Sequence, residues 1–137
     1  MRIAADISIW IVRIAGTLQL VTGALFWTGH AYMFLPLHII SGTLIVLTLG
    51  VVAVLALIAR THRGLALFGL LWGVALLAFG MRQAIVLVGS MHWIVRVVHL
   101  VMGLAAMALA GTLGQAILAA IPARVRESKR ERQAVTP

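Results

Sequence analysis

Two histidines stand inside long apolar stretches of this chain, and a glycine follows each of them four residues later. His38 precedes Gly42, and His99 precedes Gly103. Ionisable side chains are costly inside a bilayer, so those that occur there usually serve a site. A pair of imidazoles in apolar surroundings is typical of the axial ligands of a haem iron, and this is the first chemistry that the pattern predicts.

Both histidines stand at nearly the same distance from the end of their stretch. The interval from His38 to Arg60 matches, to within one residue, the interval from His99 to Pro122, which closes the last stretch. If both stretches are helices that run in the same direction, the two imidazoles lie at one depth, ~33 Å from the boundary. That depth is the outer edge of the hydrocarbon core.

The composition predicts a membrane protein. Hydrophobic residues make up 63% of the chain and charged residues 10%, and the mean hydropathy is +1.11. Such a chain has too little polar surface to cover a soluble globule. Apolar runs of about 20 residues, long enough to cross a core of ~30 Å, can be placed four times. They cover residues 7–26, 35–59, 65–88 and 93–121.

We therefore expect an all-α membrane four-helix bundle with up-down-up-down topology. These runs do not fit a β-barrel, because they are continuously apolar, whereas barrel strands alternate apolar and polar residues. The first run contains Arg13 and lacks a clean cleavage site after it, so we interpret it as a span rather than a secretory signal. Parallel helices of such a bundle are diagonal neighbours across the core, which predicts that His38 and His99 face each other.

Basic residues gather at the ends of alternate runs. Arg2, the turn over residues 60–63 and the tail fall on one side, which the positive-inside rule makes the cytoplasm. We expect a transmembrane domain over residues 1–122 and a basic cytoplasmic tail over residues 123–137, in a bacterial inner membrane. The net charge of +8 indicates contact with lipid headgroups, with no nucleic acid expected; an RNA, ribosome or protein partner is the alternative use of the tail.

The chain also consists of two similar halves, which predicts a pair of pseudo-repeated helical hairpins. The glycines of the first run correspond to glycines of the third run at a constant offset in residue number. The histidine and glycine of the second run correspond to those of the fourth run, and there the offset is slightly larger. The corresponding pairs are Gly16 with Gly73, Gly23 with Gly80, His38 with His99, and Gly42 with Gly103. His30 and His92 precede the two internal histidines in the same way.

Two imidazoles suit haem better than a metal ion held by protein alone. A zinc ion requires four ligands, whereas the chain has no cysteine and its three acids are Asp6, Glu127 and Glu131, all outside the outer half of the bundle. Haem supplies four nitrogens and requires two more. We expect the six glycines that the two halves share to leave room for the flat macrocycle.

Positive and hydrogen-bonding groups stand near the predicted outer end. Arg82, Arg96 and His92 are suited to bind the two haem propionates, and His30 is a further candidate. Each also has a simpler interpretation. Arg96 can extend to the interface, and the two outer histidines can be interfacial residues rather than ligands of a second haem.

Four membrane helices with interior histidines on non-adjacent helices, and glycines beside them, resemble the haem-binding bundle of b-type membrane cytochromes, including the cytochrome b561-like group. The resemblance covers the four runs and depends on His38, His99, Gly42 and Gly103. It implies one non-covalent haem b with the two histidines as axial ligands, and electron exchange with quinol or a protein partner. Many members have a second histidine pair near the opposite face, whereas the cytoplasmic halves of these four runs contain no histidine. Transfer of electrons across the whole membrane by one protomer is thus not implied.

A non-redox membrane protein is the competing hypothesis, either a structural subunit of a complex or a small-solute carrier with a polar stripe. In that case each histidine is a packed polar residue bonded to a neighbouring helix. Gln19, the buried amide of the first run, is expected to bond a neighbouring helix rather than a quinone. No motif of a hydrolase or an ATPase is present, and no acid inside the bundle is available for proton relay. Besides lipid, the candidate partners are a quinone, a redox protein and a second copy of the chain.

Overall fold

The four apolar runs form the long helices of a bundle in a computed structural model that describes residues 1–29 and 32–135, with side chains described through Ala120. In lipid a helix satisfies its own backbone hydrogen bonds, which is why these glycine-rich runs are helical. The helices are α1 (Arg2–Trp27), α2 (Leu35–Ile58), α3 (Arg63–Arg82) and α4 (His92–Val135), with short 3-10 helices at Tyr32–Phe34 and Gln83–Ile85.

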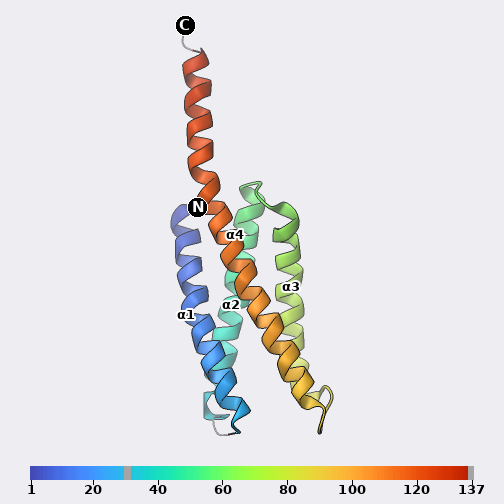
Figure 1. The fold of residues 1–137 in the computed structure, drawn as a ribbon. Coiled ribbons are helices and arrows are strands. Elements are labelled where there is room, and N and C mark those ends of the chain that lie inside the picture. Colours follow the sequence, from blue (N-terminus) through green and yellow to red (C-terminus); the bar gives the residue numbers. More distant parts are fainter. Residues whose placement is uncertain (30–31, 136–137) are drawn as a thin grey trace.

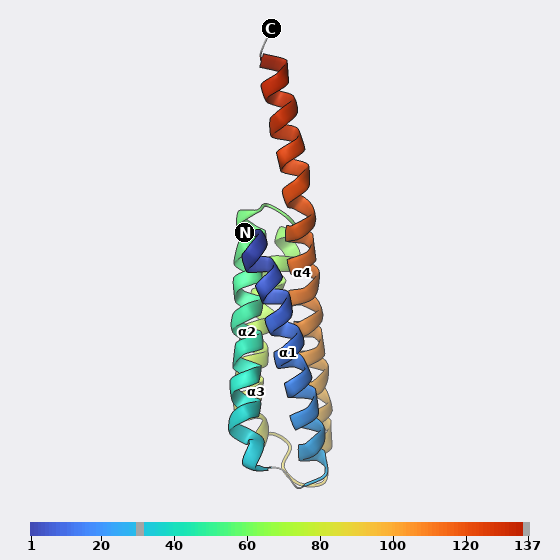
Figure 2. The same ribbon diagram turned by 90° about the vertical axis from the view of Figure 1, so that its left-hand side faces the viewer.

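The helices run alternately up and down (Figure 1). The N-terminus and the α2–α3 turn lie at one end, while the α1–α2 and α3–α4 connections lie at the other (Figure 2). The predicted all-α bundle with up-down-up-down topology is therefore confirmed. The two parallel helices α2 and α4 contact each other directly, and α1 and α3 flank this pair on opposite sides (Figure 1).

All four helices are long and apolar enough to cross a membrane. Their large apolar side chains point outward to an extent that a protein in water does not tolerate. Leu71 is 72% exposed and Val74 is 69% exposed on α3, and Leu47 is 62% exposed on α2. Such a surface matches lipid, because lipid tails are as apolar as leucine.

The core is small and is supplied mostly by α2 and α4. Its buried positions on the two helices correspond at the same offset as the two histidines do. The pairs are Ile45 with Ala106, Leu49 with Ala110, Val52 with Leu113, and Ala56 with Ile117. This burial pattern agrees with the predicted repeat of two hairpins.

Small residues set the distance between the helices. A Cβ atom placed on Gly69 of α3 would lie 3.3 Å from Cδ1 of Leu49, and one placed on Gly114 of α4 would lie 2.9 Å from Cγ1 of Ile9. The absence of side chains at these glycines allows the neighbouring helix to approach, which strengthens dispersion contacts in a solvent that offers no hydrophobic driving force.

One predicted boundary differs from the structure. The apolar pattern of the third run predicts helix to Val88, but α3 ends at Arg82 and a 3-10 turn closes at Ile85. Leu87 then has a φ of +46°, which a helix does not accommodate. Within the predicted tail, which begins after Pro122, α4 continues as helix to Val135 and extends beyond the bundle (Figure 1).

Replacing Leu49 by alanine should destabilise the bundle. Leu49 is fully buried and contacts Gly69 and Gly73 of α3, so Leu49→Ala leaves a cavity that costs about 2–5 kcal/mol. Leu47→Ala on the lipid-facing side of the same helix is the control and should cost far less. Reversible unfolding in mixed detergent micelles measures both. Equal losses would contradict the position of the core.

Candidate functional site

The structure brings the two internal histidines together near one end of the bundle. His38 lies in the first turn of α2, and His99 lies about two turns into α4, at the end opposite the N-terminus. Their ring centroids are 6.3 Å apart, with an angle of 40° between the ring planes. The prediction that these imidazoles meet across the diagonal of the bundle is confirmed, while their role as ligands stays a prediction.

A phenylalanine from the preceding helix packs against each imidazole. Phe26 of α1 lies 5.1 Å from His38 between ring centroids. Phe79 of α3 lies 6.1 Å from His99, with the two rings stacked at 18°. The aromatic side chains give the pair an apolar surrounding on both sides.

The hydrogen bonds of His38 indicate which ring nitrogen carries its proton. The Thr22 hydroxyl donates to the carbonyl oxygen of Leu18 at 2.8 Å, so its oxygen is left to accept. Nδ1 of His38 lies 2.7 Å from that oxygen and is therefore assigned as the N–H donor. Nε2 then carries the lone pair, which accepts the side-chain amide of Gln19 at 2.9 Å.

Gln19 is held by a second contact on the same side of α2. Its Oε1 accepts a hydrogen bond of 2.6 Å from the hydroxyl of Ser41. A Cβ atom on Gly42 would lie 2.8 Å from Nε2 of Gln19, so the missing side chain of this glycine leaves room for the amide. The expectation that Gln19 bonds a neighbouring helix is confirmed, and Gly42 faces this amide.

His99 differs from His38 in having an unpaired nitrogen. Its Nδ1 is buried and has no hydrogen-bond partner among the described residues. A buried polar atom without a partner costs about 1–3 kcal/mol, so such an atom in a native structure requires an explanation, such as a bound water or ion.

The internal repeat explains this difference. At the offset that relates Gly16 of α1 to Gly73 of α3, Gln19 corresponds to Leu76 and Thr22 corresponds to Phe79. The first half therefore offers its histidine an amide and a hydroxyl, while the second half offers an aliphatic and an aromatic side chain. The two imidazoles occupy equivalent places in unequal surroundings.

The six shared glycines do not all serve the histidines. Gly23 and Gly80 lie beside the rings, since a Cβ atom there would be 3.7 Å from Cε1 of His38 and 3.0 Å from Cε1 of His99, respectively. Gly16 packs against Met107, and Gly73 packs against Val46 and Leu49. A Cβ atom on Gly103 would meet nothing within 4 Å.

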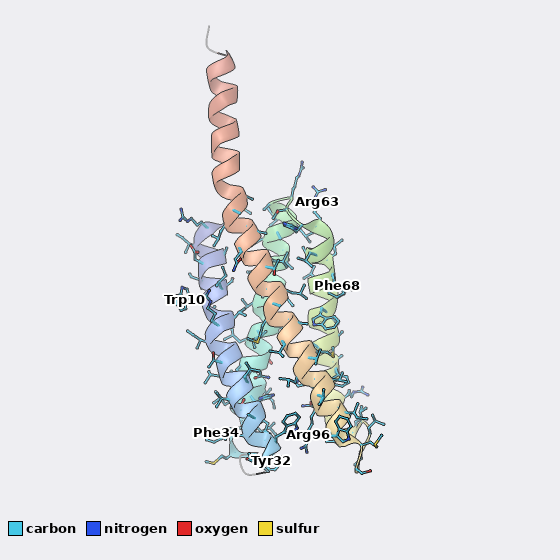
Figure 3. All side chains as sticks on the ribbon, in the orientation of Figure 1. Trp10, Tyr32, Phe34, Arg63, Phe68 and Arg96 are labelled. Atoms are coloured by element: carbon cyan, nitrogen blue, oxygen red, sulfur yellow. The ribbon has the colours of Figure 1, made fainter. Side chains whose placement is uncertain are left out.

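The polar groups predicted to bind propionates lie toward the same end but are not drawn into the pair. Arg82 and Arg96 are exposed and form no ion pair within the described part of the chain. Figure 3 shows Arg96 at the end of the bundle that carries Tyr32, opposite Arg63. His92 contacts the carbonyl oxygen of Val86 through Nδ1 at 3.3 Å, as an interfacial residue would. His30 lies outside the described residues.

Four functional candidates were not singled out from the sequence, namely Thr22, Ser41, Phe26 and Phe79. Residues 19, 22, 23 and 26 share one helical face, because they are spaced three, four and seven apart. This spacing was the available signal for Thr22 and Phe26. Ser41 stands three residues after His38 and so shares its helical face, whereas the chain offers no comparable signal for Phe79.

The donors available at the pair are few. No group of three or more histidine, cysteine, aspartate or glutamate side chains gathers anywhere in the described residues. Two imidazole nitrogens alone suit a cofactor that brings most of its own ligands. Comparisons of the chain with protein families, with curated proteins and with solved structures find no match.

The two histidines should respond oppositely to an apolar substitution in the cofactor-free protein. His38→Leu leaves the Gln19 amide and the Thr22 hydroxyl without a partner, so we expect a loss of about 1–3 kcal/mol of unfolding free energy. His99→Leu removes an unpaired nitrogen and should leave the stability unchanged or raised. Unfolding in detergent micelles measures both variants, and a larger loss for His99→Leu would contradict the hydrogen-bond assignment.

Proposed function

We propose that the protein is a membrane cytochrome that binds one haem b without a covalent bond, through His38 and His99, near the outer end of the bundle. The observation that carries the proposal is the imidazole pair itself, with 6.3 Å between ring centroids and a buried nitrogen on one ring that lacks a partner.

The distance between the ring centroids matches that of two imidazoles on one iron. Metal–imidazole bonds are ~2 Å long and the nitrogen lies about 1 Å from the ring centroid, so two imidazoles on one iron have centroids roughly 6 Å apart. Both nitrogens of His38 bond side chains of α1, so coordination would require the Gln19 amide to move. The donor set also fits, because the site supplies two nitrogens and haem requires two axial ligands. Gly23 and Gly80 have no side chain, which lets each ring lie against the preceding helix.

The chain's own residues would hold the haem and exclude water from it. His38 and His99 supply the ligand nitrogens, and Phe26 and Phe79 give them an apolar surrounding. Arg96 stands three residues before His99 on the outward side, where its charge would balance a propionate. When bound, haem would supply one-electron chemistry, which suits exchange with quinol or a redox protein.

The orientation that we propose places both termini in the cytoplasm of a bacterial cell. The N-terminus and the α2–α3 turn lie at the same end of the bundle (Figure 2), and Arg2, Arg60 and Arg63 belong to that end. The positive-inside rule assigns such an end to the cytoplasm. The histidine pair would then lie toward the outer face of the membrane.

One observation favours a non-redox protein as the second candidate. Both ring nitrogens of His38 have partners within the chain, at Thr22 and Gln19. A histidine with both nitrogens bonded needs no further ligand. Its role would then be to join α1 to α2, as interhelical hydrogen bonds do in membranes. In that case the protein would be a structural subunit or a solute carrier, and the unpaired nitrogen of His99 would need a separate explanation.

An absorption spectrum of the purified protein tests the proposal. We expect sharp α and Soret bands after reduction, at one haem per chain, in protein from cells or after addition of haemin. His38→Ala and His99→Ala should each abolish the bis-histidine spectrum, because each removes one axial ligand.

His62→Asn is the control, since this exposed histidine lies in the α2–α3 turn, at the end of the bundle that does not carry the pair. It should leave the spectrum intact. A colourless preparation that does not bind added haemin would exclude the cytochrome and favour the non-redox protein. Equal losses in all three variants would show that the ligands are wrongly assigned.

A further inference from the structure

We propose that Thr22 and Gln19 of α1 are positioning residues for His38: Thr22 holds the imidazole as its Nδ1–H tautomer, and Gln19 caps the Nε2 lone pair until a ligand atom takes its place. The role of the Nε2 lone pair as a metal ligand rests on the proposed function. The tautomer and the cap are properties of the polypeptide alone and can be measured without haem.

Thr22 is suited to fix the tautomer because its hydroxyl hydrogen is already used. Thr22 is nearly fully buried, and its hydroxyl donates to the carbonyl oxygen of Leu18 on its own helix. The oxygen is then available to accept from Nδ1 of His38, 2.7 Å away, and this direction agrees with the Gln19 amide nitrogen, a donor, lying at Nε2. Metal-bound histidines usually donate their second ring N–H in this manner, which orients the ring and raises the basicity of the coordinating nitrogen.

Gln19 is suited to cap the lone pair because its amide is held in one orientation. The hydroxyl of Ser41, itself nearly fully buried, donates to Oε1, which turns the amide NH₂ group toward Nε2 of His38. Gly42 leaves the space that the amide occupies. Coordination at Nε2 exchanges one hydrogen bond for one metal–nitrogen bond, and the flexible end of Gln19 is what has to move.

The second half of the chain shows that this arrangement is particular to His38. Leu76 and Phe79 stand at the positions equivalent to Gln19 and Thr22, and Nδ1 of His99 is buried without a partner among the described residues. One imidazole is thus oriented in advance by hydrogen bonds, while the other is held by packing. The two ligands would contribute unequally to cofactor binding.

The test begins with nitrogen NMR of the full-length, haem-free protein labelled with ¹⁵N-histidine in detergent micelles. The His38 resonances, assigned by comparison with His38→Ala, should show a protonated Nδ1 and an unprotonated Nε2. Thr22→Val, which keeps the shape and removes the hydroxyl, should shift the population toward the Nε2–H tautomer. Gly42→Ala should displace the Gln19 amide and change the Nε2 shift while Nδ1 stays protonated.

Thr17→Val is the matched control. Thr17 stands on the same helix and its hydroxyl also bonds a carbonyl one turn back, that of Arg13, but the residue is exposed. This variant should leave the His38 resonances unchanged. A wild-type His38 that is protonated at Nε2, or a Thr22→Val variant with the wild-type tautomer, would overturn the proposal.

Haem titration and redox titration separate this inference from the function on which it rests. We expect Thr22→Val to bind haemin about 10- to 100-fold more weakly, as is typical when an outer hydrogen bond to a metal ligand is lost, and to show a higher midpoint potential because the ligand is less basic. Thr22→Ser should restore both values. Wild-type protein with the Nδ1–H tautomer but no haem binding would refute the cytochrome alone, whereas haem binding with no change in Thr22→Val would refute the positioning role alone.

Discussion

The direct contact between α2 and α4 is the constraint on which the rest of the structure depends. These helices are parallel and separated in sequence, and an ordinary square bundle would hold them apart across its diagonal. Here most of the buried core belongs to them, and several of their buried residues are small, including Ala53, Ala106 and Ala110. The diagonal pair touches, with α1 and α3 on either side. Because the pair touches, the two imidazoles lie 6.3 Å apart with no other helix between them.

The two hairpins share a backbone plan and differ in chemistry. Corresponding positions form the core of α2 and α4, and Gly23 and Gly80 stand beside the imidazole of the next helix. The polar partners belong to the first hairpin alone. Between two such halves, one imidazole is oriented by hydrogen bonds and the other is held by packing.

Parts of the site followed from the sequence because they depend on distance along a helix. The equal spacing of His38 and His99 from their boundaries predicted one depth, and parallel helices predicted that they meet. The sequence predicts the end of α3 too late, because the apolar run continues beyond Arg82 although the helix does not. The positive φ of Leu87 shows that this part of the run is a loop. The internal repeat predicts the same role for Gly42 and Gly103. In the structure Gly42 faces Gln19, whereas a side chain at Gly103 would meet nothing within 4 Å. Which neighbour a glycine meets depends on the rotation of each helix about its own axis. The hydropathy pattern does not determine this rotation.

The amino-acid sequence by itself determined four apolar helices long enough to cross a membrane, their alternating directions, and the matching positions of the two histidines along them, because these properties follow from apolar length and the rise of a helix per residue. Only the tertiary structure decided that Thr22 and Gln19 bond His38 while Nδ1 of His99 stays without a partner among the described residues. Those contacts join different helices at distances near 3 Å, and a hydrogen bond of that length depends on the rotation and separation of the helices after they have packed.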